Sequence, residues 1–456
     1  MPPTLTIVGL GPGDPQLRTV AAQRALDAAD HIILRTGIHP GLADLLADAR
    51  VTTCDDIYEL GGSFDEVYAK IAERVVEAAI TSDLVYAVPG NPAFGERTLA
   101  AIRERLVETS VNVVVQSAVS ALDVVATALG VDPLSGQAQL VDAADLSAAI
   151  AGEPFSGGLI DLSPSKPCLV MQVYSPGIAS DVKLALTRLY PDEHQVTLIS
   201  AAGVGIEETV RACQLFEIDR YPVDHLKSLW VPALPELDVH RTAASLQRIT
   251  AHLRSPEGCP WDRKQNHASL RGAVIEEAFE VVDAIDAGDV EHLAEELGDL
   301  LLQVFLQSQI AEEQDEFLLE DVYEQITTKL IRRHPHVFGE DVARTPDAVV
   351  QTWERIKAQE RRQKGETATE PAPLHPLDKL PRSMPAMQKV ARALAKQGAG
   401  NGALSYATRD VVANQLFDAV AGAVSAGLDP ESELERVARQ RMDHEQTADA
   451  ADGETS

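Results

Sequence analysis

Two neighbouring stretches in the second half of the chain have apolar residues at helical spacing. The first contains Val274, Ile275, Ala278, Phe279, Val282 and Ile285, and the second contains Leu293, Leu297, Leu300, Leu301 and Val304. Repeats of three and four residues predict amphipathic helices. Between them, Ala287-Gly288-Asp289 supplies a turn, so we expect an antiparallel helical hairpin. The second helix is apolar nearly all round from Leu297 to Leu306, which predicts that it is buried.

The first 130 residues have a different pattern, in which short apolar runs lead into loops rich in Gly, Pro or Ser. These runs cover residues 4–10, 83–88 and 111–115, and the helix-forming stretches after them cover 19–29, 98–107 and 121–129. Three strand–loop–helix units predict a parallel sheet with a ligand crevice at the carboxyl ends of its strands.

The remaining segments complete a multidomain chain, with an N-terminal α/β domain followed by an all-α bundle. We expect an α/β domain at 1–234, a helical domain at 238–364, a Pro/Thr/Glu-rich linker at 365–377, a second helical region at 378–444 and a disordered tail at 445–456. Within the helical domain, helices are predicted at 243–253 and 321–334, the latter with Val322, Ile326 and Leu330 facing inward. Trp261 is expected to pack under the hairpin.

Carboxylates mark both helices of the predicted hairpin. Glu276, Glu277 and Glu280 fall on one side of the first helix, and Glu296 and Asp299 share a side of the second with Gln303. Carboxylates on an apolar helix are costly unless they are paired or bind a metal. Mg²⁺, a hard cation that takes oxygen ligands, suits such a set. The alternative, a solvated acidic face, is the interpretation we keep for Asp286, Glu291 and Glu295.

Basic residues follow on the predicted helix 321–334. Lys329 and Arg333 are four residues apart, so they project together and could grip phosphates beside a metal cluster. Arg332 at the same helix end is expected to interact favourably with the negative end of the helix dipole and not with substrate.

The carboxylate pattern EExxE followed by ExxD resembles that of the MazG family of nucleoside triphosphate pyrophosphohydrolases. The flanking stretches, Cys259-Pro-Trp-Asp-Arg-Lys-Gln265, the segment 329–338 and Trp353-Glu-Arg-Ile-Lys357, resemble this family too. The resemblance implies cleavage between the α and β phosphates, giving the monophosphate and pyrophosphate. Glu277, Glu280, Glu296 and Asp299 would then bind Mg²⁺, and Lys329 and Arg333 the phosphates, while Trp353 would stack on the base or sugar. Glu276 is assigned to orient or deprotonate the water, and Glu277 and Lys329 are also counted as catalytic.

The N-terminal loops resemble those of the tetrapyrrole (corrin/porphyrin) methylases over residues 3–232. The opening VGxGPGDPxLLTxxA of that family is nearly reproduced at Val8–Ala21. The resemblance implies two α/β subdomains with S-adenosylmethionine bound between them. Its glycine-rich loop includes Gly11, which permits close backbone approach, and Asp14, a candidate base or ligand anchor. The resemblance also implies cofactor contacts, by position, from Gly90, Asn91, Phe94, Ser120, Ala121, Met171 and Ala201.

Two loops depart from the methylase pattern. The PGxSS loop is replaced by Gln116-Ser117-Ala118-Val119-Ser120, and the GDP of the second loop is Gly90-Asn91-Pro92. These changes bear on methyl transfer more than on the fold.

The region 378–444 echoes a second MazG copy but lacks EExxE, with Ala413-Asn414 where the Gly-Asp of ELGD would stand. We expect it to serve as a scaffold or to complete a dimer. Because a two-helix hairpin cannot cover the apolar helix, a homodimer or higher homo-oligomer is expected, with two hairpins forming a four-helix bundle.

Composition limits the partners and the compartment. The 456 residues carry a formal charge of −31, from 39 basic and 70 acidic residues, which argues against a nucleic-acid polymer or an anionic membrane as partner. The cysteines at 54, 168, 213 and 259 have no CxxC spacing and are expected to be reduced and mostly buried. With no signal-like N-terminus and no long apolar run, a cytoplasmic protein is expected.

The preferred function is a Mg²⁺-dependent pyrophosphohydrolase acting on ribo- or deoxynucleoside triphosphates, joined to a domain that binds S-adenosylmethionine. The first alternative is a methyltransferase acting on a tetrapyrrole or another small methyl acceptor. The second is that the methylase-like half is a non-catalytic sensor that regulates the hydrolase.

Overall fold

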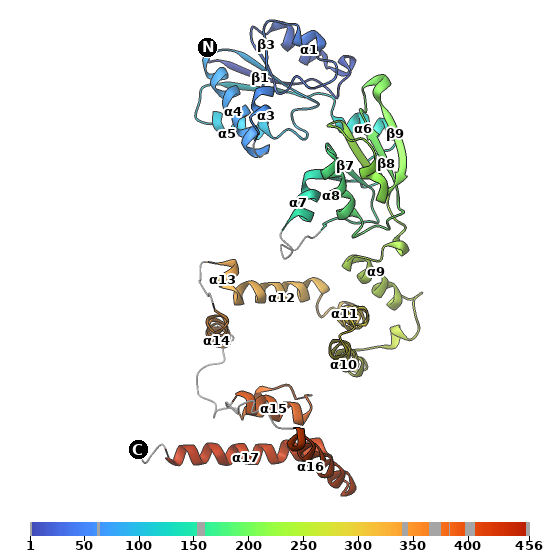
Figure 1. Ribbon diagram of the computed structural model, residues 1–456, viewed down its shortest axis with the longest axis vertical. Coiled ribbons are helices and arrows are strands. Elements are labelled where there is room, and N and C mark those ends of the chain that lie inside the picture. The colour runs from blue at the N-terminus through green and yellow to red at the C-terminus, as the bar shows by residue number, and fades with distance from the viewer. Residues whose placement is uncertain are drawn as a thin grey trace. The chain divides into compact units, whose positions relative to one another are not determined.

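The computed structural model describes residues 2–61, 64–152, 160–339, 345–363, 375–382, 384–396 and 406–452. The chain divides into two compact units, Met1–Asp321 and Val322–Ser456. The first unit contains two α/β subdomains and a helical segment, and the second is helical (Figure 1).

The first subdomain is a parallel five-stranded sheet with helices on both faces. Its strands, in the spatial order β3-β2-β4-β1-β5, are β1 (Thr4–Gly9), β2 (Ile32–Leu34), β3 (Val51–Thr53), β4 (Leu84–Val88) and β5 (Asn112–Gln116). Its helices are α1 (Val20–Ala28), α2 (Ala43–Leu46), α3 (Asp55–Glu59), α4 (Phe64–Thr81) and α5 (Thr98–Leu106). Every residue of β4 is buried, because successive side chains point to opposite faces and both faces are covered. Tyr86 packs with α4 and α5, while its neighbours Val85 and Ala87 pack with α1.

The second subdomain is a mixed sheet in the order β6-β7-β10-β8-β9, in which β6 pairs parallel to β7 and the other pairs are antiparallel. Its strands are β6 (Gln139–Asp142), β7 (Cys168–Met171), β8 (Gln195–Ser200), β9 (Thr209–Gln214) and β10 (Lys227–Val231). Its helices are α6 (Ala121–Leu129), α7 (Ala143–Ala151) and α8 (Pro176–Leu186). Val170 on β7 packs with α7 and α8, and its neighbour Leu169 packs with α6, so helices cover both faces.

A helical hairpin completes the first unit. The hairpin consists of α10 (Arg271–Ala287) and α11 (Val290–Glu313), and α9 (Ala243–Arg254) precedes it and packs against α11. Gly288 ends α10 in the left-handed conformation (φ 68°), which glycine adopts without steric cost. Asp289 then begins α11, since its carboxylate accepts from the backbone N–H groups of Glu291 and His292. The predicted antiparallel hairpin and its turn are therefore confirmed.

The helix α12 (Leu319–Arg333) begins in the first unit and continues into the second. The other helices of the second unit are α13 (Pro335–Phe338), α14 (Pro346–Gln363), α15 (Ala386–Lys396), α16 (Tyr406–Ser425) and α17 (Pro430–Asp452). Short 3-10 helices along the chain are η1 (Pro15–Leu17), η2 (Gly205–Glu207), η3 (Leu215–Arg220), η4 (Glu236–Asp238), η5 (Asp262–Lys264) and η6 (Pro376–Lys379).

In a single chain, Leu297, Leu301 and Val304 on α11 are 40–49% exposed, although α9 and α10 pack against this helix. This exposure agrees with the expectation that a two-helix hairpin cannot cover the helix. Two other predictions about burial were wrong. Trp261 is 62% exposed rather than packed under the hairpin. On α12, Ile326 and Leu330 are also exposed.

The tail prediction also needs a correction. The helix α17 continues to Asp452, so residues 445–452 are helical instead of disordered. This part of the chain contains Glu, Gln and several Ala, which favour helix. Most of the predicted linker 365–377, up to residue 374, lies outside the described residues.

Candidate functional site

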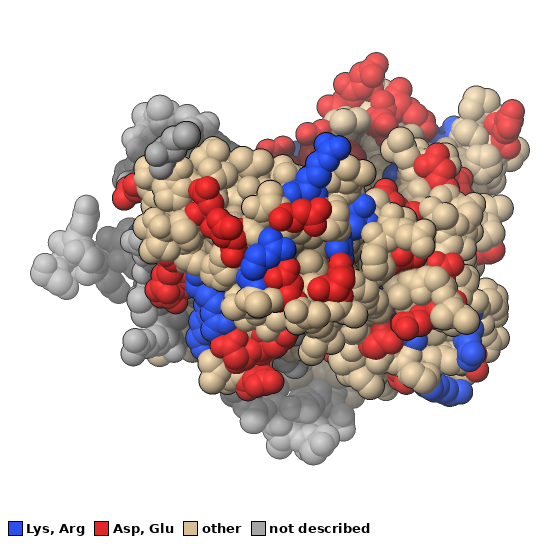
Figure 2. All heavy atoms as spheres, turned by 90° about the horizontal axis from the view of Figure 1, so that it is seen from above, with Lys and Arg blue, Asp and Glu red and all other residues tan. Residues whose placement is uncertain are grey.

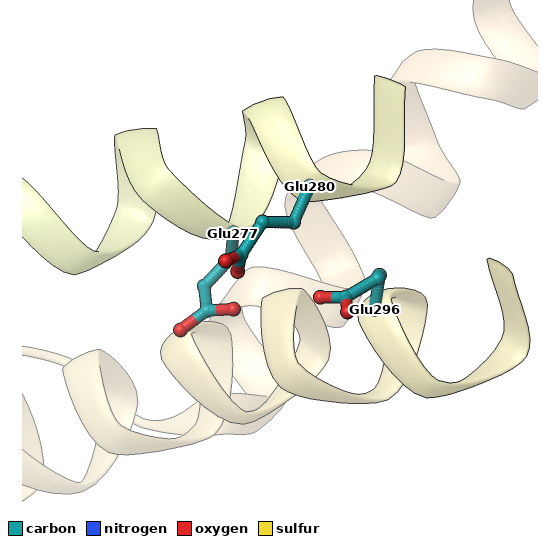
Figure 3. A group of neighbouring side chains, drawn as sticks. All are labelled: Glu277, Glu280 and Glu296. Atoms are coloured by element: carbon teal, nitrogen blue, oxygen red, sulfur yellow. The ribbon is translucent and has the colours of Figure 1, made fainter. Parts of the chain in front are cut away.

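Three carboxylates converge between α10 and α11. Glu277 and Glu280 come from adjacent turns of α10, and Glu296 comes from α11 (Figure 3). One oxygen of each lies within 4.8 Å of an oxygen of the other two. Glu296 is 7% exposed, Glu277 is half-buried and Glu280 is exposed. We call these three residues the carboxylate site.

Burial and the neighbouring negative charges raise the pKa values of two carboxylates at this site. Burial raises the pKa of Glu277, and the charges of Asp299 and Glu280 raise it further. Burial also raises the pKa of Glu296, followed by the charge of Glu280, while His292 acts in the opposite direction. A bound cation would relieve this repulsion, and an all-oxygen ligand set fits a hard cation such as Mg²⁺.

The other two predicted carboxylates lie at the edge of the site. Asp299 is exposed on α11, and its charge is near enough to raise the pKa of Glu277. Glu276 is exposed on α10, one residue before Glu277. Neither is among the three residues whose oxygens converge.

Two further residues of α11 were not singled out as site residues by the sequence. His292 Nε2 lies 3.4 Å from Glu296 Oε1, one helical turn away. Gln303 is buried, and its Oε1 has no hydrogen-bond partner among the described residues. The i,i+4 spacing of His292 and Glu296 was a usable signal.

The predicted phosphate- and base-binding residues Lys329, Arg333 and Trp353 belong to the second unit. There, Glu360 on α14 receives two hydrogen bonds from Arg333, with an Nη2–Oε2 distance of 2.7 Å. This hydrogen bond raises the pKa of Arg333. Lys329 is exposed, and the ring of Trp353 meets the ring of His334 edge-on at 5.3 Å between centroids.

A second candidate site is a cavity of about 830 Å³ between the two α/β subdomains. Residues from both subdomains line it, including the loops that follow β1, β2, β4 and β7. Gln172 lines the cavity with a positive φ of 63°, a conformation rare for a non-glycine residue and often found at binding sites. We call it the cleft cavity.

Four of the nine predicted cofactor residues line the cleft cavity, namely Gly90, Phe94, Ala121 and Met171. The other five support the surrounding loops. Gly11 exchanges two backbone hydrogen bonds with Gly90, while Asp14 begins η1 by accepting from the N–H of Gln16. Asn91 donates to the carbonyl of Ala118 at 2.6 Å. Ser120 is the N-cap of α6, and Ala201 has a positive φ beside the lining residue Ala202.

The sequence did not single out the charged residues of the cleft cavity. Arg35 follows β2 directly and forms an ion pair with Glu96, which follows β4, at 3.3 Å between Nε and Oε2. Burial disfavours the charge of Arg35, but Glu96 and nearby tyrosines raise its pKa overall. His39 donates from Nε2 to the Gly11 carbonyl, and burial lowers its pKa to about 4. The sequence positions of Arg35, His39 and Glu96, after strands of a parallel sheet, could have indicated this site, because the carboxyl ends of parallel strands lie at one edge of the sheet.

Two known families match the chain, one in each half. Residues 265–338 match the MazG nucleotide pyrophosphohydrolase domain, and residues 4–219 match the tetrapyrrole (corrin/porphyrin) methylases. The uncharacterized protein YabN of Bacillus subtilis is 38% identical over 391 residues, which cover 85% of this chain and 76% of YabN. This chain belongs to the family of fused tetrapyrrole methylase–MazG proteins.

Its MazG domain also resembles separate MazG proteins. The nucleoside triphosphate pyrophosphohydrolase/pyrophosphatase MazG of Thermotoga maritima is 51% identical over 119 residues, which are 26% of this chain and 45% of that protein. The nucleoside triphosphate pyrophosphohydrolase of Escherichia coli K12 is 39% identical over 176 residues, which are 38% of this chain and 64% of that protein. The fused chain thus matches less than two thirds of either one.

Three further features bear on the partners and the location of this fused protein. On the face drawn in Figure 2, Lys and Arg side chains lie among Asp and Glu side chains without a continuous basic area. In the described part of the chain, no helix is long and apolar enough to cross a membrane. The cysteines are free, and three of the four are buried, as expected.

Proposed function

We propose that this fused protein is a Mg²⁺-dependent nucleoside triphosphate pyrophosphohydrolase. The observation that carries the proposal is the convergence of Glu277, Glu280 and Glu296 within 4.8 Å, in a chain whose MazG domain matches pyrophosphohydrolases. The products are a nucleoside monophosphate and pyrophosphate, with one water consumed.

The residues present fit a divalent cation. Glu277, Glu280 and Glu296 would hold it, and Asp299 at the edge of the site is the fourth predicted ligand. When bound, Mg²⁺ neutralises phosphate charge and lowers the pKa of a coordinated water.

The other predicted residues act on the substrate directly. Glu276, exposed beside Glu277, orients or deprotonates the attacking water. Lys329 and Arg333 hold the pyrophosphate group that leaves, and Trp353 provides an aromatic surface for the base or sugar. Arg333 must share its guanidinium between Glu360 and the phosphates.

Release of pyrophosphate from nucleoside triphosphates tests this function. The wild type should require Mg²⁺, and Glu296→Gln should lose about 100-fold or more of kcat. Glu295→Gln is the matched control, because it removes the same charge from the exposed neighbouring position. Equal activity of Glu296→Gln and the control would contradict the proposal.

A second candidate activity belongs to the methylase half, because Gly90, Phe94, Ala121 and Met171 line one cavity. This half would bind S-adenosylmethionine and methylate a tetrapyrrole or another small acceptor, or else sense a small molecule and regulate the hydrolase. Calorimetric titration of the full chain with S-adenosylhomocysteine tests it. Val124→Trp, inside the cavity, should abolish binding, while Val107→Trp at an exposed position should not.

We also propose a homo-oligomer and a cytoplasmic location. The exposed apolar residues of α10 and α11 suit a second hairpin, which would complete a four-helix bundle. The four free cysteines suit a compartment that keeps thiols reduced.

A further inference from the structure

The wall of the cleft cavity carries more negative than positive charge. Its carboxylates are Asp55, Glu59, Glu96, Asp142 and Asp224, and its Lys and Arg residues are Arg35, Arg97 and Lys227. His39 adds no charge at neutral pH, since burial lowers its pKa to about 4.

Each of these three cations already has a partner. Arg35 is paired with Glu96, whose side chain is 4% exposed. Arg97 lies 3.8 Å from Asp142 across the cleft and 3.6 Å from Asp65. Lys227 is buried and donates to the carbonyl of Pro222. Every cation of the wall therefore already lies beside a protein acceptor, and an incoming anion would compete with that acceptor for it.

Two carboxylates of the wall, Glu59 and Asp224, have fewer interactions with the protein. Glu59 is exposed, and Asp224 accepts a hydrogen bond from the backbone N–H of Leu226. Within the described residues, neither forms an ion pair. Aromatic rings of Tyr58, Tyr68, Phe94 and Tyr174 also line the cavity. Carboxylates and aromatic rings together favour cations and planar neutral groups.

We propose that the cleft cavity binds a small acceptor that is uncharged or positively charged and excludes tetrapyrroles bearing several carboxylates. A polycarboxylate would meet like charges on the wall, and its own carboxylates would be desolvated without free cations to receive them. The term acceptor depends on the methylase function proposed above, because only a methyltransferase would transfer a methyl group to the bound molecule. The charge preference itself rests on the residues of the wall.

Equilibrium binding of uroporphyrin III, a polycarboxylated tetrapyrrole with its own fluorescence, tests this preference on the full chain. The wild type should show no saturable binding. The double variant Glu96→Gln/Asp142→Asn removes the carboxylate paired with Arg35 and one of the two beside Arg97. It should bind saturably, at least about tenfold more tightly than the detection limit that the wild type sets, or about 1.4 kcal/mol. Both substitutions keep an oxygen that can cap the neighbouring backbone N–H, of Thr98 and Ala144 respectively, and a thermal unfolding scan of the variant checks that its fold is retained.

The matched control is Asp48→Asn/Asp56→Asn, which removes two carboxylates paired with Arg50 and Arg74 outside the cavity. An equal gain in this control would overturn the proposal, since net charge alone would explain the result. Saturable wild-type binding of uroporphyrin III that Val124→Trp abolishes would overturn it too. If S-adenosylhomocysteine fails to bind the wild type, the methylase function fails, and the porphyrin comparison still tests the charge preference.

Discussion

Glu280 on α10 and Glu296 on α11 bring carboxylate oxygens within 4.8 Å of each other across the helical hairpin. Glu277, one turn before Glu280, joins them. Three carboxylates at this separation repel one another, and the raised pKa values of Glu277 and Glu296 have this repulsion as a cause after burial. A cation bound between the two helices would compensate the repulsion.

Metal binding should therefore stabilise the protein. Mg²⁺ at millimolar concentration is expected to raise the midpoint of thermal unfolding, because it binds the folded state and not the unfolded chain. Glu296→Gln should remove most of this increase, and Glu295→Gln should retain it. Calorimetric scans with Mg²⁺ and with a chelator measure the effect. An increase that persists in Glu296→Gln would show that the metal acts elsewhere.

Without metal, the carboxylate site should make stability depend on pH in a defined direction. The pKa values of Glu277 and Glu296 lie above the ordinary 4.5 in the folded protein, so the folded state holds protons more tightly than the unfolded chain. Stability contributed by these groups should increase as pH falls from neutral through the raised values. Urea unfolding in chelator at a series of pH values, compared with Glu277→Gln/Glu296→Gln, isolates this contribution. An identical pH profile for the two proteins would contradict it.

The main features of the carboxylate site could be predicted from the sequence. The spacing places Glu277 and Glu280 on adjacent turns of one helix, and Gly288 reverses the chain toward Glu296, so the convergence of these three follows from local rules. The pattern did not distinguish them from Glu276 and Asp299, which lie outside the convergence. The sequence also indicated that one hairpin leaves apolar residues such as Leu297 and Leu301 uncovered, but apolar periodicity does not say what covers them.

Pairings between distant residues were also beyond the sequence pattern. Arg333 and Glu360 are 27 positions apart, and Arg97 meets Asp142 from a different subdomain. Such contacts depend on tertiary packing and on the path of the loops between elements. The strand–loop–helix pattern indicated the edge of the sheet where the cleft cavity lies, but not the charge of its wall.

Gly9 should be essential for the loops beneath the cleft cavity. A Cβ at this position would lie 2.3 Å from the carbonyl oxygen of Gly90 and 2.5 Å from Cβ of Ala118. Gly9→Ala should therefore cost about 1–3 kcal/mol of stability and weaken binding in the cavity. Gly272→Ala on α10 meets no atom within 4 Å and should be neutral or stabilising by up to about 1 kcal/mol. Scanning calorimetry on both variants measures their unfolding temperatures. Equal unfolding temperatures for Gly9→Ala and Gly272→Ala would contradict this prediction.

The exposed apolar face of the hairpin should hold copies of the chain together. Leu301→Glu is expected to shift the protein toward monomer in analytical ultracentrifugation, because it places a charge beside the exposed Leu297 and Val304 on the same helix. Leu237→Glu, at an exposed position outside the hairpin, should leave the assembly intact. A wild-type protein that sediments as a monomer while fully active would remove the basis for this proposal.

The central claim is that the hairpin is a pyrophosphohydrolase centre, and product analysis tests it most directly. A panel of ribo- and deoxynucleoside triphosphates would be incubated with Mg²⁺ and the wild type, Glu277→Gln or Asp299→Asn. The wild type should yield monophosphate and pyrophosphate, and the two variants should lose both products. Absence of triphosphate hydrolysis by the wild type, or release of diphosphate and phosphate instead, would contradict the claim.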